Sequence, residues 1–279
     1  MFAVTLSIAQ VKDAHRTTSE FLNALKGAKA GSIIKLADGK YNLGEDINLK
    51  LQGTSNSPII IKAQHKGKAK FIEQSHFILT ASEYVVIEGF DFTSTDGHVI
   101  ALYSCNNIQI TRNVFRLQET KDASWIIIDG IKGDIVQLSH HDRVDHNIFE
   151  KKSKLGKFIS IDGTMSFYPQ VSQYDRIDHN LFKDIGPQVE NVLEAVRVGW
   201  ADYSLSSGFT IIEENLFKRC DGDPEYVSVK SSDDTIRHNT FWECLGSLSL
   251  RHGNRSTVEA NYIIGNNRTG TFIDSTGKA

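Results

Sequence analysis

One short motif recurs along the chain and restricts the folds open to it. An apolar residue is followed three positions later by asparagine and five positions later by an aromatic or aliphatic residue. Six copies place their asparagines at Asn113, Asn147, Asn180, Asn215, Asn239 and Asn261. The steps between them are 34, 33, 35, 24 and 22 residues, which indicates a basic unit of about 23 residues with inserts of about ten.

The rest of the chain agrees with a solenoid built from this unit. Short β-branched runs alternate with Gly, Asn, Asp and Ser, and the helical pattern is confined to residues 19–29. A period in the low twenties without a helix in each repeat is typical of a parallel β-helix, in which each rung has three short strands. We therefore predict an all-β fold, a right-handed single-stranded parallel β-helix with an N-terminal capping helix. Stacked asparagines should satisfy backbone groups at a turn, and stacked phenylalanines should fill the interior.

The pattern gives no sign of a linker, so residues 1–279 are expected to form a single β-helix domain. Residues 19–29 should cover the first rung, because an open end exposes strand edges. Residues 1–10 are apolar and end in small residues, but they lack a positively charged start. They are interpreted as either a first strand or the remnant of an export signal, and a secreted or periplasmic location is expected.

Composition excludes several classes of partner. The formal net charge is −3, so the chain carries no overall basic field that would attract nucleic acid. No apolar run approaches the roughly 18 residues of a membrane-spanning helix. We expect neither a nucleic-acid partner nor a membrane partner, and an anionic ligand would need a local basic patch.

Three basic residues are predicted to form such a patch. Alternation along the strands around them places Arg197, Lys230 and Arg251 on the outside of the coil. Their separations of 33 and 21 residues match one rung with an insert and then one plain rung. We expect a vertical column of three cations, although a single outward Lys or Arg is usually an ordinary solvated charge.

Oxygen-bearing side chains follow the same spacing. Asp223 and Glu225 directly precede the Lys230 strand, and Asn191 lies 32 residues before Asp223. Two carboxylates and an amide are ligands that suit Ca²⁺. The sequence predicts a calcium site formed by these three residues; the alternative is a simple acidic turn.

The combination fits one reaction class, the β-elimination of a 4-linked uronic-acid polymer. That reaction removes the proton next to the carboxylate, protonates the departing oxygen and neutralises the carboxylate. Lys230 is the candidate base, Arg251 the candidate acid, and calcium the candidate neutralising group. A neutral lysine requires a lowered pKa, which the nearby positive charges would supply.

Two segments, 225–241 and 246–254, together with 259–262, resemble polysaccharide lyase family six, which contains alginate lyases and chondroitinase B. The specific part is the string Leu-Arg-His-Gly-Asn joined to the Val-Lys-Ser strand. The resemblance implies a parallel β-helix, Lys230 as base, Arg251 as acid and calcium at Asn191, Asp223 and Glu225. It further implies substrate contacts from Arg197 and His252, and alginate as the first choice of substrate.

The chain departs from the family in two places. Asp223 stands where the family commonly has Glu, which gives the metal ligand a shorter arm. Family members usually continue through further rungs beyond the end of this sequence, so the last rung is expected to be uncovered. Two interpretations are open, a homodimer that forms through this rung or an interrupted gene.

Two other functions are left open at this stage. A glycoside hydrolase on the same fold would use Asp223 and Glu225 as its acid and base. A non-catalytic polysaccharide-binding β-helix module would keep the charged face without needing a base.

Overall fold

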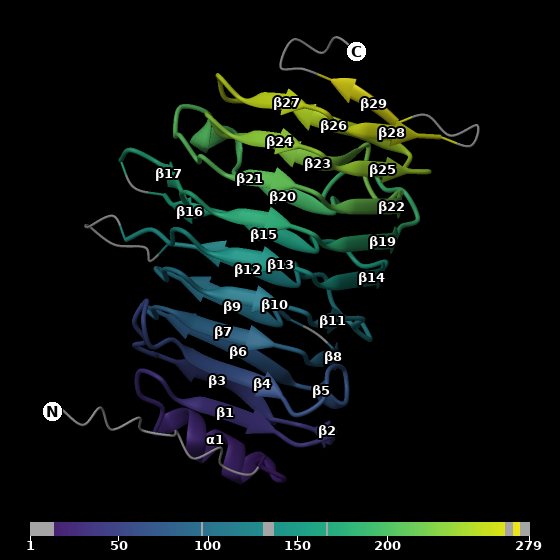
Figure 1. The fold of residues 1–279 in the computed structure, drawn as a ribbon. Coiled ribbons are helices and arrows are strands. Elements are labelled where there is room, and N and C mark those ends of the chain that lie inside the picture. Colours follow the sequence, from purple (N-terminus) through teal and green to yellow (C-terminus); the bar gives the residue numbers. More distant parts are fainter. Residues whose placement is uncertain (1–13, 96, 131–136, 166, 266–269, 274–279) are drawn as a thin grey trace, which may run out of the picture.

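The computed structural model describes residues 14–95, 97–130, 137–165, 167–265 and 270–273. Within them the chain winds into a parallel β-helix with three long sheets (Figure 1). Each turn of the coil gives one strand to each sheet, so that the strands stack into nine rungs. The predicted right-handed all-β solenoid is confirmed, and its sense is the one favoured for connections between parallel strands.

The first sheet contains β1 (Ile33–Leu36), β4 (Ile59–Ala63), β7 (Val85–Glu88), β10 (Gln109–Thr111), β13 (Arg143–Asp145), β18 (Arg176–Asp178), β21 (Ile211–Glu213), β24 (Thr235–Arg237) and β27 (Thr257–Glu259). The second sheet contains β2 (Gly39–Tyr41), β5 (Ala69–Glu73), β8 (Asp91–Ser94), β11 (Val114–Phe115), β14 (Ile148–Lys152), β19 (Leu181–Ile185), β22 (Leu216–Cys220), β25 (Thr240–Trp242) and β28 (Tyr262–Ile264).

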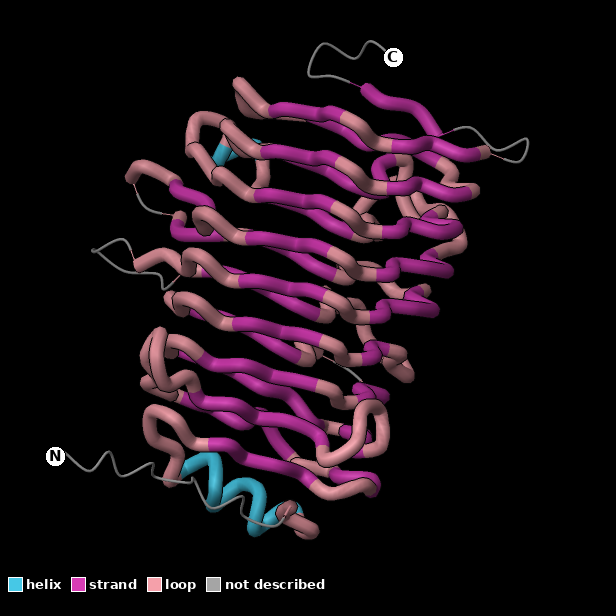
Figure 2. Tube along the Cα trace, in the orientation of Figure 1, coloured by secondary structure: helices cyan, strands magenta, loops and turns pink. Residues whose placement is uncertain are grey.

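The third sheet contains β3 (Glu45–Leu49), β6 (Ser75–Thr80), β9 (Ile100–Tyr103), β12 (Ile126–Asp129), β15 (Ile159–Ile161), β20 (Val196–Val198), β23 (Glu225–Val229), β26 (Gly246–Leu250) and β29 (Gly270–Ile273). Two inserts follow its strands. A small antiparallel pair, β16 (Gly163–Thr164) and β17 (Gln170–Val171), follows β15, and a short 3₁₀ helix, η1 (Ala201–Tyr203), follows β20. Figure 2 shows the loops gathered at the corners where one sheet passes into the next.

The repeated asparagines form a buried ladder at the corner between the first and second sheets. The Asn147 Oδ1 accepts the backbone N–H of Asn113 at 2.9 Å, and the Asn147 Nδ2 donates to the Ile110 carbonyl at 2.8 Å. The same pair of contacts recurs in the rungs of Asn180, Asn215, Asn239 and Asn261. Each asparagine thus satisfies backbone groups of the preceding rung, as the sequence predicts.

The phenylalanines of the motif stack along the interior of the second sheet. Ring centroids are 4.6 Å apart between Phe115 and Phe149 and 4.8 Å apart between Phe182 and Phe217. These distances equal the spacing of parallel strands. The rings are fully buried, so each rung contributes one aromatic layer to a continuous core.

The helix α1 (Thr18–Lys26) lies across the first rung (Figure 1). It begins with a capping box, because the Thr17 hydroxyl accepts the Glu20 N–H and the Glu20 carboxylate accepts the Thr17 N–H. Phe21 and Leu25 are buried against the core. The predicted capping helix is confirmed, but it ends three residues earlier than expected, at Lys26, with Gly27 as its C-cap.

Residues 1–10, expected to be a first strand or an export-signal remnant, lie outside the described residues. In the part of the chain that is described, no helix is long and apolar enough to cross a membrane. In the final rung, Ile263 occupies an inward position above Phe241 and is 44% exposed.

Candidate active site

Two cationic side chains, Lys230 and Arg251, project outward side by side from neighbouring rungs of the third sheet. Strands β23 and β26 pair in parallel with Val229 opposite Leu250, and the Arg251 N–H donates to the Val229 carbonyl at 2.9 Å. Val229 is buried in the core, so the alternation of side chains directs the next residue, Lys230, outward. Lys230 and Arg251 therefore occupy equivalent positions one rung apart, as predicted.

The turn after Arg251 is held against the turn below it. Gly253 has φ +86°, and a Cβ at this position would lie 2.0 Å from the Ser231 carbonyl oxygen. Only glycine fits such an approach, which accounts for the Arg-His-Gly order in the sequence. His252, half-buried, is carried on this turn beside the outward cations.

The register corrects the predicted column of three cations. Arg197 pairs with Ser228, not with Lys230. Gly199 takes the position below Lys230, since the Lys230 N–H bonds to the Val198 carbonyl at 2.8 Å. The prediction assumed that the two rungs are offset by the 33 residues from Arg197 to Lys230. The paired strands are offset by 31 residues, so the residue below Lys230 is two positions after Arg197.

Arg197 also differs from expectation in its exposure. Its side chain is buried, and its guanidinium donates to Asp162 at 2.8 Å and to the Ser160 hydroxyl at 3.0 Å. The same group lies over the Trp200 ring, 4.6 Å from the centroid. Arg197 is a fixed charge in the wall of the site, and Trp200, 49% exposed, forms the adjoining surface.

The structure brings together two of the three predicted oxygen ligands, Asp223 and Glu225, at the edge where the chain enters the third sheet, and places Asn191 on the adjoining loop. The Asp223 Oδ1 accepts the Glu225 N–H at 2.9 Å, and its Oδ2 accepts the Leu193 N–H at 3.3 Å. Asn191 lies two residues before Leu193 and is exposed, with its Oδ1 accepting the Val192 N–H at 2.9 Å. The loop that carries Asn191 thus rests on the Asp223 carboxylate.

Glu225 joins the acidic edge to the cations. Its Oε1 is 2.9 Å from the Arg251 Nη1, and its Oε2 accepts the Ser228 hydroxyl. The structure therefore brings Asp223, Glu225, Lys230 and Arg251 into one cluster, as the sequence predicts.

Sequence reasoning missed a buried pair at the same edge, Lys157 and Glu194. The Lys157 Nζ and the Glu194 Oε2 are 3.5 Å apart, and both side chains are at most 5% exposed. This Glu194 oxygen has no hydrogen-bond partner among the described residues. The 37-residue step from Lys157 to Glu194 equals the step from Ser160 to Arg197, so strand register could have revealed the pair.

The surroundings lower the pKa of Lys230. Burial is the main cause that lowers the pKa of Lys230, and the positive charges of Arg197 and Arg251 lower it further. Glu194 and Glu225 act in the opposite direction. The lowered pKa of Lys230 agrees with the prediction from sequence. The predicted cause was the charge of neighbouring cations, whereas desolvation is the larger cause.

The carboxylates of the edge are crowded. Burial raises the pKa of Asp223, and the negative charges of Glu194 and Glu225 raise it further. Crowded carboxylates beside a side-chain amide fit a hard cation such as Ca²⁺ in donor type. Within the described residues, no group of three or more His, Cys, Asp or Glu has the arrangement of a metal site, so a cation here would depend on the Asn191 amide as well.

Comparison with known proteins places the chain among the polysaccharide lyases. The family model described as chondroitinase B matches residues 16–274. The chain belongs to polysaccharide lyase family six, as the resemblance of its sequence indicates. A search of curated proteins finds no match.

Several solved structures are similar. The alginate lyase AlyGC of this family has 31% identity and a TM-score of 0.77, over 93% of this chain and 36% of its own. A mannuronic acid specific family 6 lyase from human gut microbiota has 25% identity and a TM-score of 0.74, over 90% of this chain and 59% of its own.

A third relative, a family 6 alginate lyase in complex with a trisaccharide, has 22% identity and a TM-score of 0.75, over 92% of this chain and 55% of its own. At this identity the likeness shows the fold alone. The chain thus spans less than two thirds of the length of each of these relatives.

Proposed function

We propose that this chain cleaves a 1,4-linked uronic-acid polymer, alginate, by β-elimination. The observation that carries the proposal is the position of Lys230, half-buried and next to Arg251 of the following rung. Burial favours the neutral amine that a base requires. Membership in family six supports the reaction class, and the alginate lyases among its solved relatives support the substrate.

In the proposed reaction, Lys230 accepts the proton from C5 of the uronate, next to the carboxylate. The electron pair of that C–H bond forms the C4–C5 double bond while the C4–O4 bond breaks. Arg251 transfers a proton to the departing O4, and afterwards Lys230 releases its proton to water while Arg251 regains one from water. Glu225 holds the Arg251 guanidinium in place through the 2.9 Å contact. Arg197, fixed by Asp162 and Trp200, keeps a positive charge near Lys230.

We propose Asn191, Asp223 and Glu225 as the ligands of a calcium ion at the acidic edge. Calcium, when bound, supplies a positive charge that neutralises the carboxylate of the substrate. Asp223 is the residue that fixes the geometry, because two backbone N–H groups hold its carboxylate. Arg197 and His252 are proposed as the neighbouring contacts to the sugar. Since a polymer of this kind is met outside the cytoplasm, we also propose a secreted or periplasmic location.

The test is digestion of alginate followed by ultraviolet absorbance, because elimination leaves a conjugated double bond and hydrolysis does not. The wild-type chain should raise the absorbance in step with new reducing ends. Lys230→Ala should abolish both signals, and Lys66→Ala, an exposed lysine between the first and second sheets, should change neither. New reducing ends without absorbance would establish a hydrolase, and binding without either signal would establish a non-catalytic module.

The substrate and the metal are tested in the same assay. Defined mannuronate and guluronate blocks and dermatan sulfate are digested in parallel, since the family model bears the name of chondroitinase B. Turnover of dermatan sulfate alone would overturn the choice of alginate. Addition of a chelator should suppress the rate and calcium should restore it, whereas an unchanged rate would remove calcium from the proposal.

A further inference from the structure

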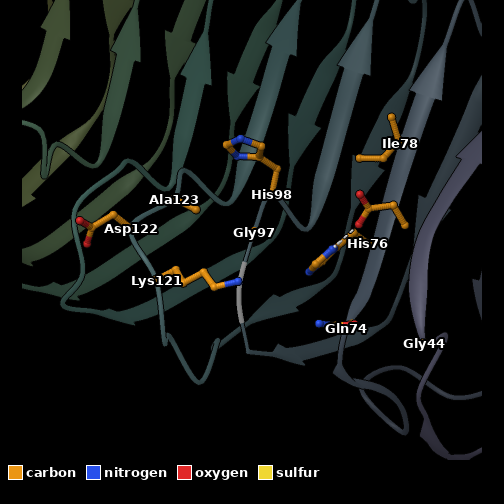
Figure 3. A pocket seen from close by; sticks show the side chains of 10 residues that line it. Gly44, Gln74, His76, Ile78, Gly97, His98, Lys121, Asp122 and Ala123 are labelled. Atoms are coloured by element: carbon orange, nitrogen blue, oxygen red, sulfur yellow. Dashed lines mark hydrogen bonds and ion pairs between the residues drawn. The ribbon is translucent and has the colours of Figure 1, made fainter.

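A cavity opens on the third sheet, far from Lys230. Its volume is about 520 Å³, and it lies beside the strands β3, β6 and β9 (Figure 3). Two imidazoles, His76 and His98, and the ammonium group of Lys121 line it together with the carboxylates of Asp46 and Asp122. The ammonium donor and the acidic acceptors together suit a ligand that carries both a carboxylate and hydroxyl groups.

The two imidazoles are held in defined orientations. The His76 Nδ1 lies 2.7 Å from the Asp46 Oδ1, and these residues are directly opposite each other in β6 and β3. The His98 Nδ1 lies 2.7 Å from the Ser124 carbonyl oxygen, which can only accept, so this nitrogen carries the proton. The Nε2 of His98 has no partner among the described residues and is left for a ligand.

The wall that bears Lys121 and Asp122 is anchored to the next rung. The Asp122 Oδ1 accepts the Leu155 N–H at 3.1 Å, and the Ala123 N–H donates to the Leu155 carbonyl at 2.9 Å. Nearby, the fully buried Lys152 is paired with Glu119. The cavity is therefore preformed, and a ligand need not pay the entropy of ordering this wall.

Its opening depends on Gly97. This residue has φ +79°, and a Cβ here would lie 3.0 Å from the His76 Cε1. A side chain at this position would press on the imidazole ring. Glycine lets the backbone pass close to His76 while leaving the cavity open.

The cavity and the candidate active site share one edge of one sheet. Asp46 and His76 lie near the start of their strands, as Asp223 and Glu225 lie at the start of β23. Five rung steps separate β6 from β23, which corresponds to about 24 Å along the axis of the coil. A linear polysaccharide that lies along the coil axis would span both places.

We propose that this cavity is a second binding site for the acidic polysaccharide, holding a uronate unit several sugars away from the bond that is cleaved. Lys121 binds the carboxylate, and the Nε2 of His98 together with Asp46 and Asp122 accepts hydrogen bonds from sugar hydroxyls. The choice of ligand rests on the proposed function, whereas the site itself rests on the residues of the cavity. Long chains should use both sites, and a trisaccharide should reach the catalytic one alone.

The test measures binding and turnover separately. Affinity electrophoresis in gels containing alginate reports binding without any cleavage, and a gel containing a neutral glucan is the control. His98→Ala/Lys121→Ala should weaken the retardation by alginate about tenfold, the effect expected for losing a charge-assisted contact. The matched variant His65→Ala/Lys68→Ala removes an exposed histidine and lysine from another corner of the coil and should migrate as wild type.

In turnover, the cavity variant should raise KM for polymeric alginate about tenfold with kcat unchanged. Its kinetics on a trisaccharide should equal those of the wild type. Equal retardation of the cavity variant and the wild type would overturn the second site.

The binding assay is repeated in a Lys230→Ala background to separate the two proposals. Loss of retardation there on mutating the cavity, with no Lys230-dependent turnover, would keep the second site and overturn the lyase. Lys230-dependent turnover with unchanged retardation would do the reverse. Lys121→Glu, an exposed charge reversal, gives the same readout if the double variant fails to fold, and must also weaken retardation.

Discussion

The inner and outer faces of the third sheet are built by different rules. On the inner face of β20 and β23, Val196 lies below Val227 and Val198 below Val229, all fully buried. On the outer face, Arg197 lies below Ser228, whereas Lys230 and Arg251 occupy equivalent positions in two neighbouring rungs. Apolar residues stack on apolar residues inside the coil, whereas the outer face accepts both like pairs, such as Ser228 and Ser249, and unlike pairs, such as Arg197 and Ser228. The polar residues of the site can therefore change from rung to rung without disturbing the packing inside.

The largest expected effect tests the outer face. Arg251→Ala should lower kcat on alginate by about 10²- to 10⁴-fold, the range for losing an acid–base group. The pKa of Lys230, which Arg251 helps to lower, should rise. Because the base must be neutral, the acidic limb of the pH–rate profile should move to higher pH.

Arg255→Ala is the matched control, because Arg255 pairs with Asp233 of the preceding rung and not with Glu225. Its rate and profile should equal those of the wild type. A profile for Arg251→Ala that does not move would contradict the electrostatic coupling to Lys230.

The second prediction tests the inner ladder. Asn180→Ala removes the acceptor of the Asn147 N–H and the donor to the Val144 carbonyl, both buried. Two unsatisfied backbone groups should lower the free energy of unfolding by about 2 to 5 kcal/mol. Urea denaturation measures the loss, and the specific activity of the folded fraction should stay the same. A stable variant with low activity would break the separation of the two faces.

The third prediction concerns buried acids at the corner between the third and first sheets. Asp142 and Asp175 are stacked, with the Asp142 N–H donating to the Asp175 Oδ1 at 2.9 Å. Burial raises the pKa of Asp175 to about 7. The folded state therefore prefers the protonated acid, and its stability should fall as the pH rises from about 4, the unfolded value, to about 7.

Asp175→Asn keeps the accepting oxygen and removes the ionisation. It should be more stable than the wild type at pH 8, by about 2 kcal/mol, with a smaller difference at pH 5. Urea midpoints at the two pH values check this. Parallel curves for the two proteins would show that Asp175 does not ionise in the folded state.

The smallest effect belongs to the outer face of the first sheet. Arg143 donates to both oxygens of Asp178, at 2.6 and 2.8 Å, and its side chain is 38% exposed. Asp178 also contacts His179 at 2.7 Å, a contact that does not involve the arginine. Arg143→Ala should therefore cost about 0.5 to 1 kcal/mol, less in high salt, and leave catalysis unchanged. A large loss of activity would mean that this face takes part in function.

The sequence predicted the interior of the coil well, because the repeated motif gives the number of residues from one rung to the next. Each motif asparagine must lie beside the next to serve its backbone, so the register of Asn113 to Asn261 follows from the residue numbers. Lys230 and Arg251 were placed correctly for the same reason, since a plain rung of 21 residues separates them. Strand alternation then decided which side chains face outward.

The remainder depended on loops. Arg197 was misplaced by two residues because the insert that carries η1 has no counterpart in the next rung. Glu194 and Lys157 belong to no motif, so their pairing shows only once the register of β15 and β20 is known. The cavity beside β3 and β6 was also not predicted. Gly97 and Lys121 come together there because of the path of backbone segments that share no sequence pattern.

The asparagine ladder has a direction. Every rung of the ladder completes the hydrogen bonding of the one before it, as Asn147 does for Asn113. A ribosome delivers the chain in that same order, with α1 and the first coils emerging ahead of the rest. The coil can thus fold rung by rung from the N-terminus. Each new rung completes the backbone hydrogen bonds of the rung before it, and the newest rung stays incomplete until the next one forms.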